Sequence, residues 1–149
     1  MKLENQVTSL ELSKLLQELG VKQKSLFIWA LNYDNETVLP VLYQTKYGCY
    51  AQDGSMVNLN NIKVLKWYSA FTVAELGEML PVRDYLSEGI VKDKEDLASW
   101  STFKSDGKWH CHLTWRYSRD KVEAIKADTE ADARAKMLIY LLENNLITL

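Results

Sequence analysis

Both histidines of the chain lie in one short segment, residues 109–117, in which apolar and polar side chains alternate. If this segment is a β-strand, His110 and His112 point to the same face and stand about 7 Å apart. That spacing suits two ligands of a zinc ion or another transition metal, with a further ligand such as Asp106 supplied from elsewhere. Cys111 lies between them and would point to the opposite face. His110 and His112 are therefore candidate metal ligands, but we favour histidines that pair across a strand.

The alternation divides this segment into a row that faces the core and a row that faces away from it. The apolar row comprises Trp109, Cys111, Leu113, Trp115 and Tyr117. The polar row comprises His110, His112, Thr114 and Arg116. Because this polar row holds every imidazole of the chain, we take it as the candidate binding face.

The sequence contains no pattern that is typical of an enzyme. It has no Gly-x-Ser-x-Gly motif around a nucleophile, and its six glycines are spread singly instead of forming a phosphate-binding loop. The histidines beside Cys111 would face away from it in a strand, whereas Cys49 could meet a histidine only through folding. We therefore predict no catalytic residue and no cofactor, and consider a non-enzymatic protein the better interpretation. A small metal-dependent enzyme remains a distant alternative.

The composition is that of a globular chain of 149 residues, 47% hydrophobic and 26% charged, which is long enough to bury a core. We predict a single globular domain over residues 1–149. A net charge of -2 provides no general attraction for nucleic acid or for an anionic membrane.

Two distant cysteines without a Cys-x-x-Cys pair favour reduced thiols in a cytoplasmic protein. The longest uncharged runs, residues 25–33 among them, are far shorter than the roughly 20 residues of a membrane helix, and nothing indicates a signal peptide.

Three threonines, each placed three residues before a carboxylate, predict the starts of three helices. A threonine oxygen at that position accepts a hydrogen bond from an otherwise unpaired amide of the first turn. The pairs are Thr8 with Glu11, Thr72 with Glu75 and Thr129 with Asp132. We expect the helices to end at about Leu19 before Gly20, at Leu80 before Pro81, and at about Glu143.

The remaining periodic segments are predicted to be strands. They cover residues 26–31, 37–43, 48–51, 62–68, 98–104 and 108–118. Asp106 and Gly107 give the clearest hairpin signal, and Pro40 should lie in an edge strand because it has no amide hydrogen. Strands interrupted by single helices favour an α+β fold. We expect an antiparallel sheet of about four to six strands packed by N- and C-terminal helices, with one short middle helix.

The second half of the last predicted helix, residues 137–142, is apolar on every side. A helix without a polar face is usually buried between layers or against another chain. Burial within the chain is the interpretation we favour. The alternative is a homodimer through Met137, Leu138, Tyr140 and Leu141.

Three blocks of the sequence resemble one group of proteins. Residues 69–81 read SAFTVAELGEMLP, residues 133–143 read ARAKMLIYLLE, and residues 8–21 fit the same pattern. They are similar to short uncharacterised proteins of Bacteroides-type bacteria and of their phages and mobile elements. No reaction or catalytic residue is assigned to that group. The resemblance implies a bacterial or phage cytoplasmic protein that acts through partners.

Besides the distant enzyme alternative, two functions remain open, and the first is preferred. It is a non-enzymatic accessory or interaction protein of a bacterial or phage system, which meets an unknown protein partner through its apolar helix or an exposed sheet edge. The alternative is a sheet-based binder of single-stranded nucleic acid. Its aromatic and basic residues would be Trp100, Phe103, Lys108, Trp109, Trp115 and Arg116. Tryptophans at period two usually face a core, which places this function second.

A helix-turn-helix DNA reader is also not supported. The capped helix that begins near Thr8 is the right kind of first helix, but a second helix with polar and basic side chains should follow it. Instead, residues 26–31 are apolar and strand-like. The chain therefore offers no recognition helix after Gly20.

Overall fold

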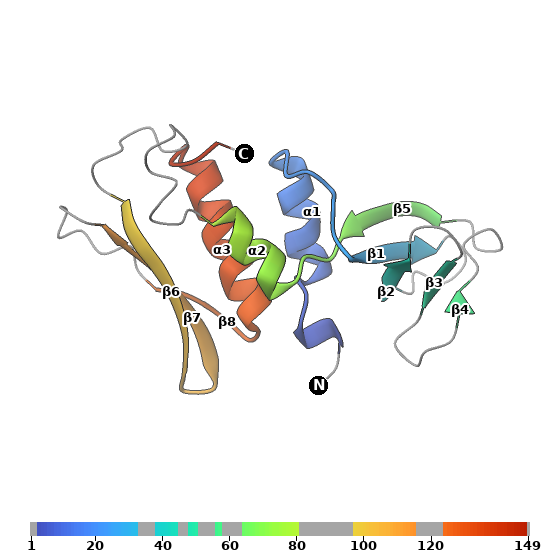
Figure 1. The fold of residues 1–149 in the computed structure, drawn as a ribbon, viewed down its shortest axis with the longest axis horizontal. Helices are drawn as coiled ribbons and strands as arrows, with labels where there is room; N and C mark the ends of the chain where they lie inside the picture. The colour runs from blue at the N-terminus through green and yellow to red at the C-terminus, as the bar shows by residue number, and fades with distance from the viewer. Residues whose placement is uncertain are drawn as a thin grey trace. The chain divides into compact units, whose positions relative to one another are not determined.

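The computed structural model describes residues 3–32, 38–44, 48–50, 56–57, 64–80, 97–115 and 124–148 and confirms the α+β class (Figure 1). The chain divides into two compact units, Met1–Thr72 and Val73–Leu149, which are described separately. The prediction of a single domain remains a prediction. The predicted N-terminal, short middle and C-terminal helices are all present. The described strands, however, are divided between two antiparallel sheets, where the sequence led us to expect one.

The first unit is a five-stranded sheet with a helix against it. Its elements are η1 (Leu3–Asn5), α1 (Leu10–Glu18), β1 (Phe27–Asn32), β2 (Val38–Gln44), β3 (Gly48–Tyr50), β4 (Met56–Val57) and β5 (Val64–Ser69). The strand order is β4-β3-β2-β1-β5, and α1 packs against β5. Buried Val7, Trp29 and Ala70 form the centre of a hydrophobic cluster. The apolar stripe of α1 thus covers one end of the sheet, as its amphipathic pattern indicated.

Thr8 does not cap α1 as predicted. Ser9 occupies the N-cap position, and Thr8 is fully buried one residue earlier. The Thr8 hydroxyl accepts a hydrogen bond from the Phe71 amide (3.0 Å) and lies 2.7 Å from the Ser13 hydroxyl. Its main-chain carbonyl accepts a bond from the Trp29 indole at 2.7 Å. The Thr8 hydroxyl thus satisfies buried polar groups of other residues. Leaving those groups without a hydrogen bond would cost more free energy than losing a helix cap, so Thr8 serves them instead of capping α1.

Pro40 is likewise not in an edge strand, because β2 lies between β1 and β3. At Pro40 itself, β2 pairs with Trp29 of β1, whereas β3 pairs only with the later residues Leu42 to Gln44. Among the described residues, no third strand therefore needs an amide hydrogen from Pro40. The missing amide hydrogen of Pro40 is therefore not required on the β3 side.

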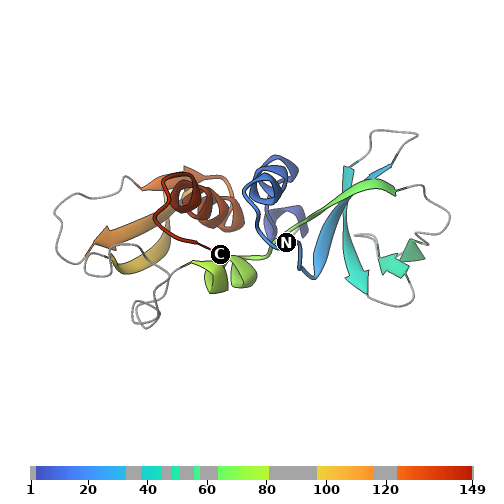
Figure 2. The same ribbon diagram turned by 90° about the horizontal axis from the view of Figure 1, so that it is seen from above.

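The second unit has a three-stranded sheet, with helices at both ends of its sequence. Its elements are α2 (Val73–Met79), β6 (Leu97–Ser105), β7 (Lys108–Trp115), β8 (Ile125–Ala127) and α3 (Glu130–Glu143). The strand order is β6-β7-β8, and α3 packs against β7, β8 and α2 (Figures 1 and 2). The Asp106–Gly107 turn is confirmed, since both residues have positive φ angles, 51° and 75°. Strand β8 was not predicted.

The helix α3 has the predicted bounds and the predicted cap. The Thr129 hydroxyl accepts a hydrogen bond from the Asp132 amide at 3.1 Å. Of the four residues named for a homodimer, Met137, Leu138 and Leu141 are fully buried within this chain, and Tyr140 is half-buried. The homodimer stays a prediction, with no exposed aliphatic surface at these three positions to support it. No helix among the described residues has the length and apolar character that crossing a bilayer requires.

Candidate binding face on the β6–β8 sheet

The three strands of the second unit present two chemically different faces. The inner face packs against α3 and includes the buried residues Cys111, Leu113 and Ala127. The alternation of β7 places His110 and His112 on the other side, as predicted. Register then adds residues from the neighbouring strands, because His110 lies opposite Phe103 of β6 and opposite Lys126 of β8. We call this side the outer face; its described residues are Ser101, Phe103, Ser105, Lys108, His110, His112 and Lys126.

An aromatic cluster of Phe103, His110 and His112 forms the centre of the outer face. The Phe103 and His110 rings are stacked, with centroids 4.9 Å apart and planes 13° from parallel. His112 lies diagonally, 5.1 Å from the Phe103 centroid and tilted by 38°. Both imidazoles come from β7, so they cover the side of the phenyl ring that is directed toward that strand. Phe103 nevertheless remains 44% exposed, which leaves aromatic surface available to another molecule.

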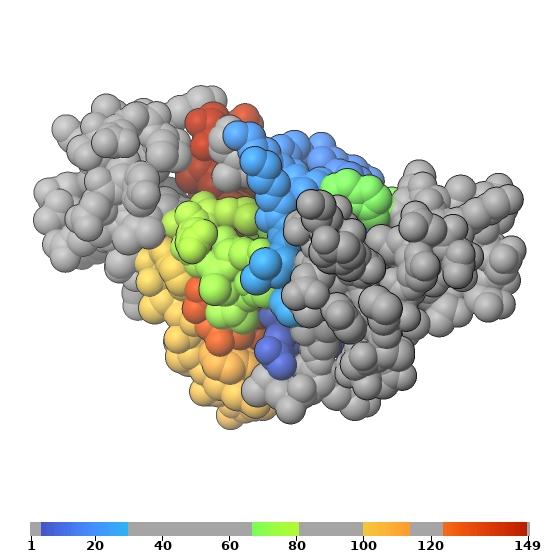
Figure 3. Space-filling model, turned by 45° about the vertical axis from the view of Figure 1, so that its right-hand side comes forward, coloured from blue at the N-terminus to red at the C-terminus, as the bar shows by residue number. Residues whose placement is uncertain are grey.

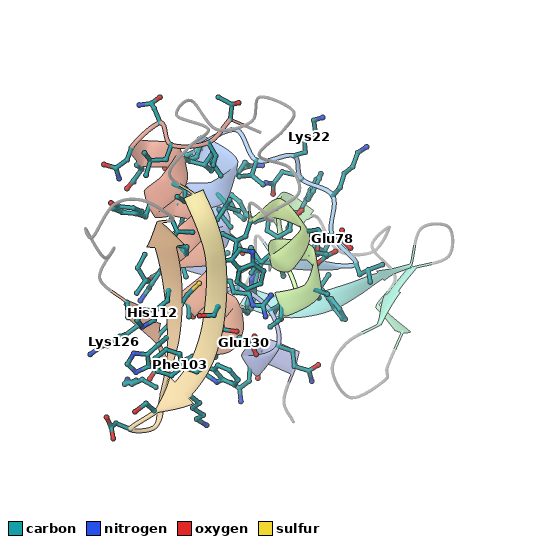
Figure 4. The ribbon with its side chains drawn as sticks, turned by 60° about the vertical axis from the view of Figure 1, so that its left-hand side comes forward. Lys22, Glu78, Phe103, His112, Lys126 and Glu130 are labelled. Atoms are coloured by element: carbon teal, nitrogen blue, oxygen red, sulfur yellow. The ribbon has the colours of Figure 1, made fainter. Side chains whose placement is uncertain are left out.

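Positive charge adjoins this cluster. Figure 4 shows Phe103, His112 and Lys126 near one another at the sheet, with Glu130 on the opposite side of the strands. Lys126 is exposed, and no carboxylate among the described residues forms an ion pair with it. The Lys136 ammonium donates to the main-chain carbonyl of Lys126 at 3.3 Å, which brings a second cation to β8. The β8 side of the cluster thus has the Lys126 ammonium on the outer face, and Lys136 of α3 contacts the main chain of the same strand.

Charge is balanced at the hairpin end of the outer face. Lys108 forms an ion pair with Asp128, and both side chains are largely exposed. The hydrogen bond from Lys108, and then its positive charge, lower the pKa of the Asp128 carboxyl. Lys108 is thus already occupied by a carboxylate, whereas Lys126 is available to a ligand.

A polar network on the other side of the sheet holds the scaffold of the face in place. Glu130 of α3 accepts hydrogen bonds from Arg134 Nη2 at 2.5 Å and from the Thr102 hydroxyl at 2.9 Å. Arg134 Nη1 donates to the Val73 carbonyl at 3.2 Å, and the guanidinium lies 4.6 Å from the Trp100 ring centroid. The network thus joins β6, α2 and α3 through one guanidinium, so we interpret this ion pair as structural.

Cys111 is enclosed on the inner face. Cys111 is 0% exposed, and burial raises the pKa of its thiol to about 11. The positive charge of Arg134 lowers this pKa by a smaller amount, and the negative charge of Glu130 raises it slightly. A buried thiol with a raised pKa is a poor nucleophile, because the thiolate is the reactive species. Cys111 therefore acts as a small core residue. Cys49 lies in β3, and its side chain is outside the described residues.

The predicted binding residues are only partly visible in the structure. His110 and His112 lie together on the outer face, Thr114 belongs to β7 without a described side chain, and Arg116 is outside the described residues. The described residues contain no group of three or more histidine, cysteine or acidic side chains that could hold a metal ion. Metal binding by His110 and His112 is the less favoured alternative, and it is not tested.

The nucleic-acid hypothesis grouped residues that the sheet separates. Trp100 and Trp109 lie in the same alternating rows as Cys111, on the inner side, and Trp100 contacts Arg134 there. Phe103 is on the outer face, and its place beside the histidines was missed. The Asp106–Gly107 turn could have revealed it, because a two-residue hairpin loop fixes the cross-strand register.

The surface around β6 can be followed in Figure 3, where atoms of the β6–β7 hairpin, in yellow to orange, lie beside those of α2 in green.

Comparison with protein-family models, with curated proteins and with solved structures found no match to this chain. Because no similar protein suggests a function, we infer one from the residues of the outer face.

Proposed function

We propose that this chain is a non-enzymatic interaction protein and that the outer face of the β6–β8 sheet is its contact surface. The observation that carries the proposal is the 44% exposure of Phe103 within a cluster of three aromatic rings. The resemblance of the helical blocks to bacterial and phage proteins suggests the setting, that of an accessory protein that works through a partner.

The position of Phe103 supports a role in binding. Its strand ends at a two-residue turn, and the neighbouring Thr102 is tied to Glu130 of α3 on the inner side. The phenyl ring is therefore presented on an ordered support. Large aromatic residues that are held rigidly lose little conformational entropy on binding, and they dominate the energy of many interfaces.

Site-specific photo-crosslinking in the cells that encode the protein tests this proposal. A benzophenone amino acid is placed at Ser101, which lies on the outer face, or at Lys104, which is exposed on the same strand but belongs to the other row. We expect adducts from position 101 and few from position 104, and Phe103→Ser should remove the former. Equal adducts at both positions, or adducts that Phe103→Ser leaves unchanged, would contradict the proposed surface.

A further inference from the structure

We propose that the molecule bound by the outer face is single-stranded nucleic acid, with a base stacked on Phe103 and a phosphate further along the nucleic-acid strand held by Lys126. This inference rests on the proposed function, because it specifies the ligand of the same surface. The arrangement that carries it is an exposed aromatic ring and, two strands away on the same face of an antiparallel sheet, a lysine without a described carboxylate partner.

The stacking geometry suits a base. His110 and His112 lie on the β7 side of the Phe103 ring, and the stack with His110 is nearly parallel. Phe103 belongs to β6, which is the last strand of the described sheet on that side. A flat ring added to the exposed side of Phe103 would continue this stack. Every nucleobase has a flat aromatic surface, so such a site accepts bases with little regard to sequence.

Lys126 can hold a phosphate because no described carboxylate pairs with it, whereas Lys108 is already paired with Asp128. Lys126 lies directly across the sheet from His110, about two strand spacings, or roughly 10 Å, from the strand of Phe103. A base stacked on the side of Phe103 that faces away from β7 lies about one ring spacing farther from Lys126, so the phosphate held by Lys126 belongs to a nucleotide further along the nucleic-acid strand than the stacked base. Because the chain as a whole has a net charge of -2, attraction must come from this local group and not from a general field.

Among the possible partners of this surface, the surroundings of the cluster favour a nucleic acid over a protein. Phe103 is bordered on its own face by the hydroxyls of Ser101 and Ser105, and Lys126 is exposed nearby. A protein contact surface normally has a contiguous apolar centre that is depleted of lysine and serine. One phenyl ring among hydroxyl and ammonium groups suits alternating bases and phosphates better. A duplex hides the flat sides of its bases, so a single strand is the expected form.

Fluorescence anisotropy with the full chain tests the inference. The probes are labelled single-stranded oligonucleotides of about 12 nucleotides, oligo(dT) and oligo(U), and a duplex of equal length, in about 50 mM salt. We expect the single strands to bind, the duplex to bind more weakly, and Phe103→Ser to weaken binding about tenfold while Phe103→Tyr keeps most of it. Thermal unfolding of each variant establishes that it is folded.

Two charge-reversal variants separate a local contact from general electrostatics. Lys126→Glu should weaken binding and reduce its dependence on salt, whereas Lys104→Glu has the same charge change on an exposed residue of the other row and should have a much smaller effect. Equal effects of the two variants would overturn the inference, as would Phe103→Ser binding as tightly as the unchanged chain.

The two proposals fail in different ways. If no oligonucleotide binds, but crosslinking from position 101 still captures a protein in a manner that depends on Phe103, the ligand assignment is wrong and the contact surface stands. If neither oligonucleotides bind nor Phe103-dependent adducts form, both proposals are wrong.

Discussion

A Cβ atom added to Gly77 would lie 2.7 Å from Nη1 of Arg134, so the end of the Arg134 side chain would have to shift. The glycine therefore makes room in α2 for the guanidinium that joins this helix to α3. Trp100 contributes to the same enclosure, since its ring would lie 3.8 Å from that Cβ atom. A residue that is unfavourable in a helix interior thus leaves space for a tertiary contact.

We expect Gly77→Ala to lower the free energy of unfolding by about 1 kcal/mol. A glycine-to-alanine substitution in a helix interior ordinarily has the opposite effect and raises this free energy by about 1 kcal/mol. The added methyl group displaces Arg134 from the Val73 carbonyl and disturbs its ion pair with Glu130. Chemical denaturation measures the change. In an Arg134→Ala background the same substitution should become stabilising, and stabilisation by Gly77→Ala alone would show that Arg134 yields without loss.

The buried hydroxyl of Thr8 leads to a second prediction. Thr8→Val keeps the shape of the side chain but leaves the Phe71 amide and the Ser13 hydroxyl without this partner. We expect a loss of about 2 kcal/mol in the free energy of unfolding, because a buried polar group that loses its hydrogen bond is not compensated by water.

A double-mutant cycle checks this assignment. Thr8→Val combined with Ser13→Ala should cost less than the sum of the two single changes, since the residues share one hydrogen bond. Gln17→Ala, at an exposed position of α1, provides a control that should change stability little. Additive effects of Thr8 and Ser13 would argue that their contact contributes nothing.

The thiol of Cys111 should be protected in the folded protein and reactive after unfolding. In a Cys49→Ser background, which leaves one thiol, we expect a disulfide reagent at about pH 8 to label the native chain only as fast as it unfolds. Labelling is followed by absorbance. Rapid modification without denaturant would contradict the complete burial of this side chain.

The same thiol should make stability depend on alkaline pH. Burial raises the Cys111 pKa from 9.0 to about 11, so between these values the unfolded chain loses a proton that the folded chain keeps. This contribution to stability is therefore fully present below pH 9 and is lost as pH rises toward 11. Denaturation at several pH values should show a steeper decline for the parent chain than for Cys111→Ala. Parallel curves would mean that the thiol does not contribute.

The exposed pair of Lys108 and Asp128 predicts an acid titration. Because the hydrogen bond and the charge of Lys108 lower the pKa of Asp128, Lys108→Met should raise it toward its ordinary value. The charge of Lys136 has a smaller lowering effect, so Lys136→Met should produce a smaller rise. Carboxyl carbon chemical shifts measure both. The stabilisation from this pair is present at neutral pH and lost as pH falls through the lowered pKa.

The sequence alone determined those features that depend on residues close together along the chain. The alternation around His110 and His112 defines the two faces of β7, and the Asp106–Gly107 turn follows from residues that accept positive φ angles. The helix α3 begins after the Thr129 cap and has the predicted bounds. Capping, turn geometry and side-chain alternation act over a few residues, so they can be predicted without the fold.

Contacts between distant residues were decided only by the tertiary structure. The role of Thr8 depends on Phe71, which is 63 residues away, and the need for Gly77 appears only when α3 brings Arg134 against α2. The division of the strands into two sheets and the short strand β8 were likewise not predicted, because pairing partners are set by burial and register across the chain. For the candidate site, the sequence identified the histidines of the outer face. Tertiary packing then buried the other side of the sheet and added Phe103 and Lys126 to them.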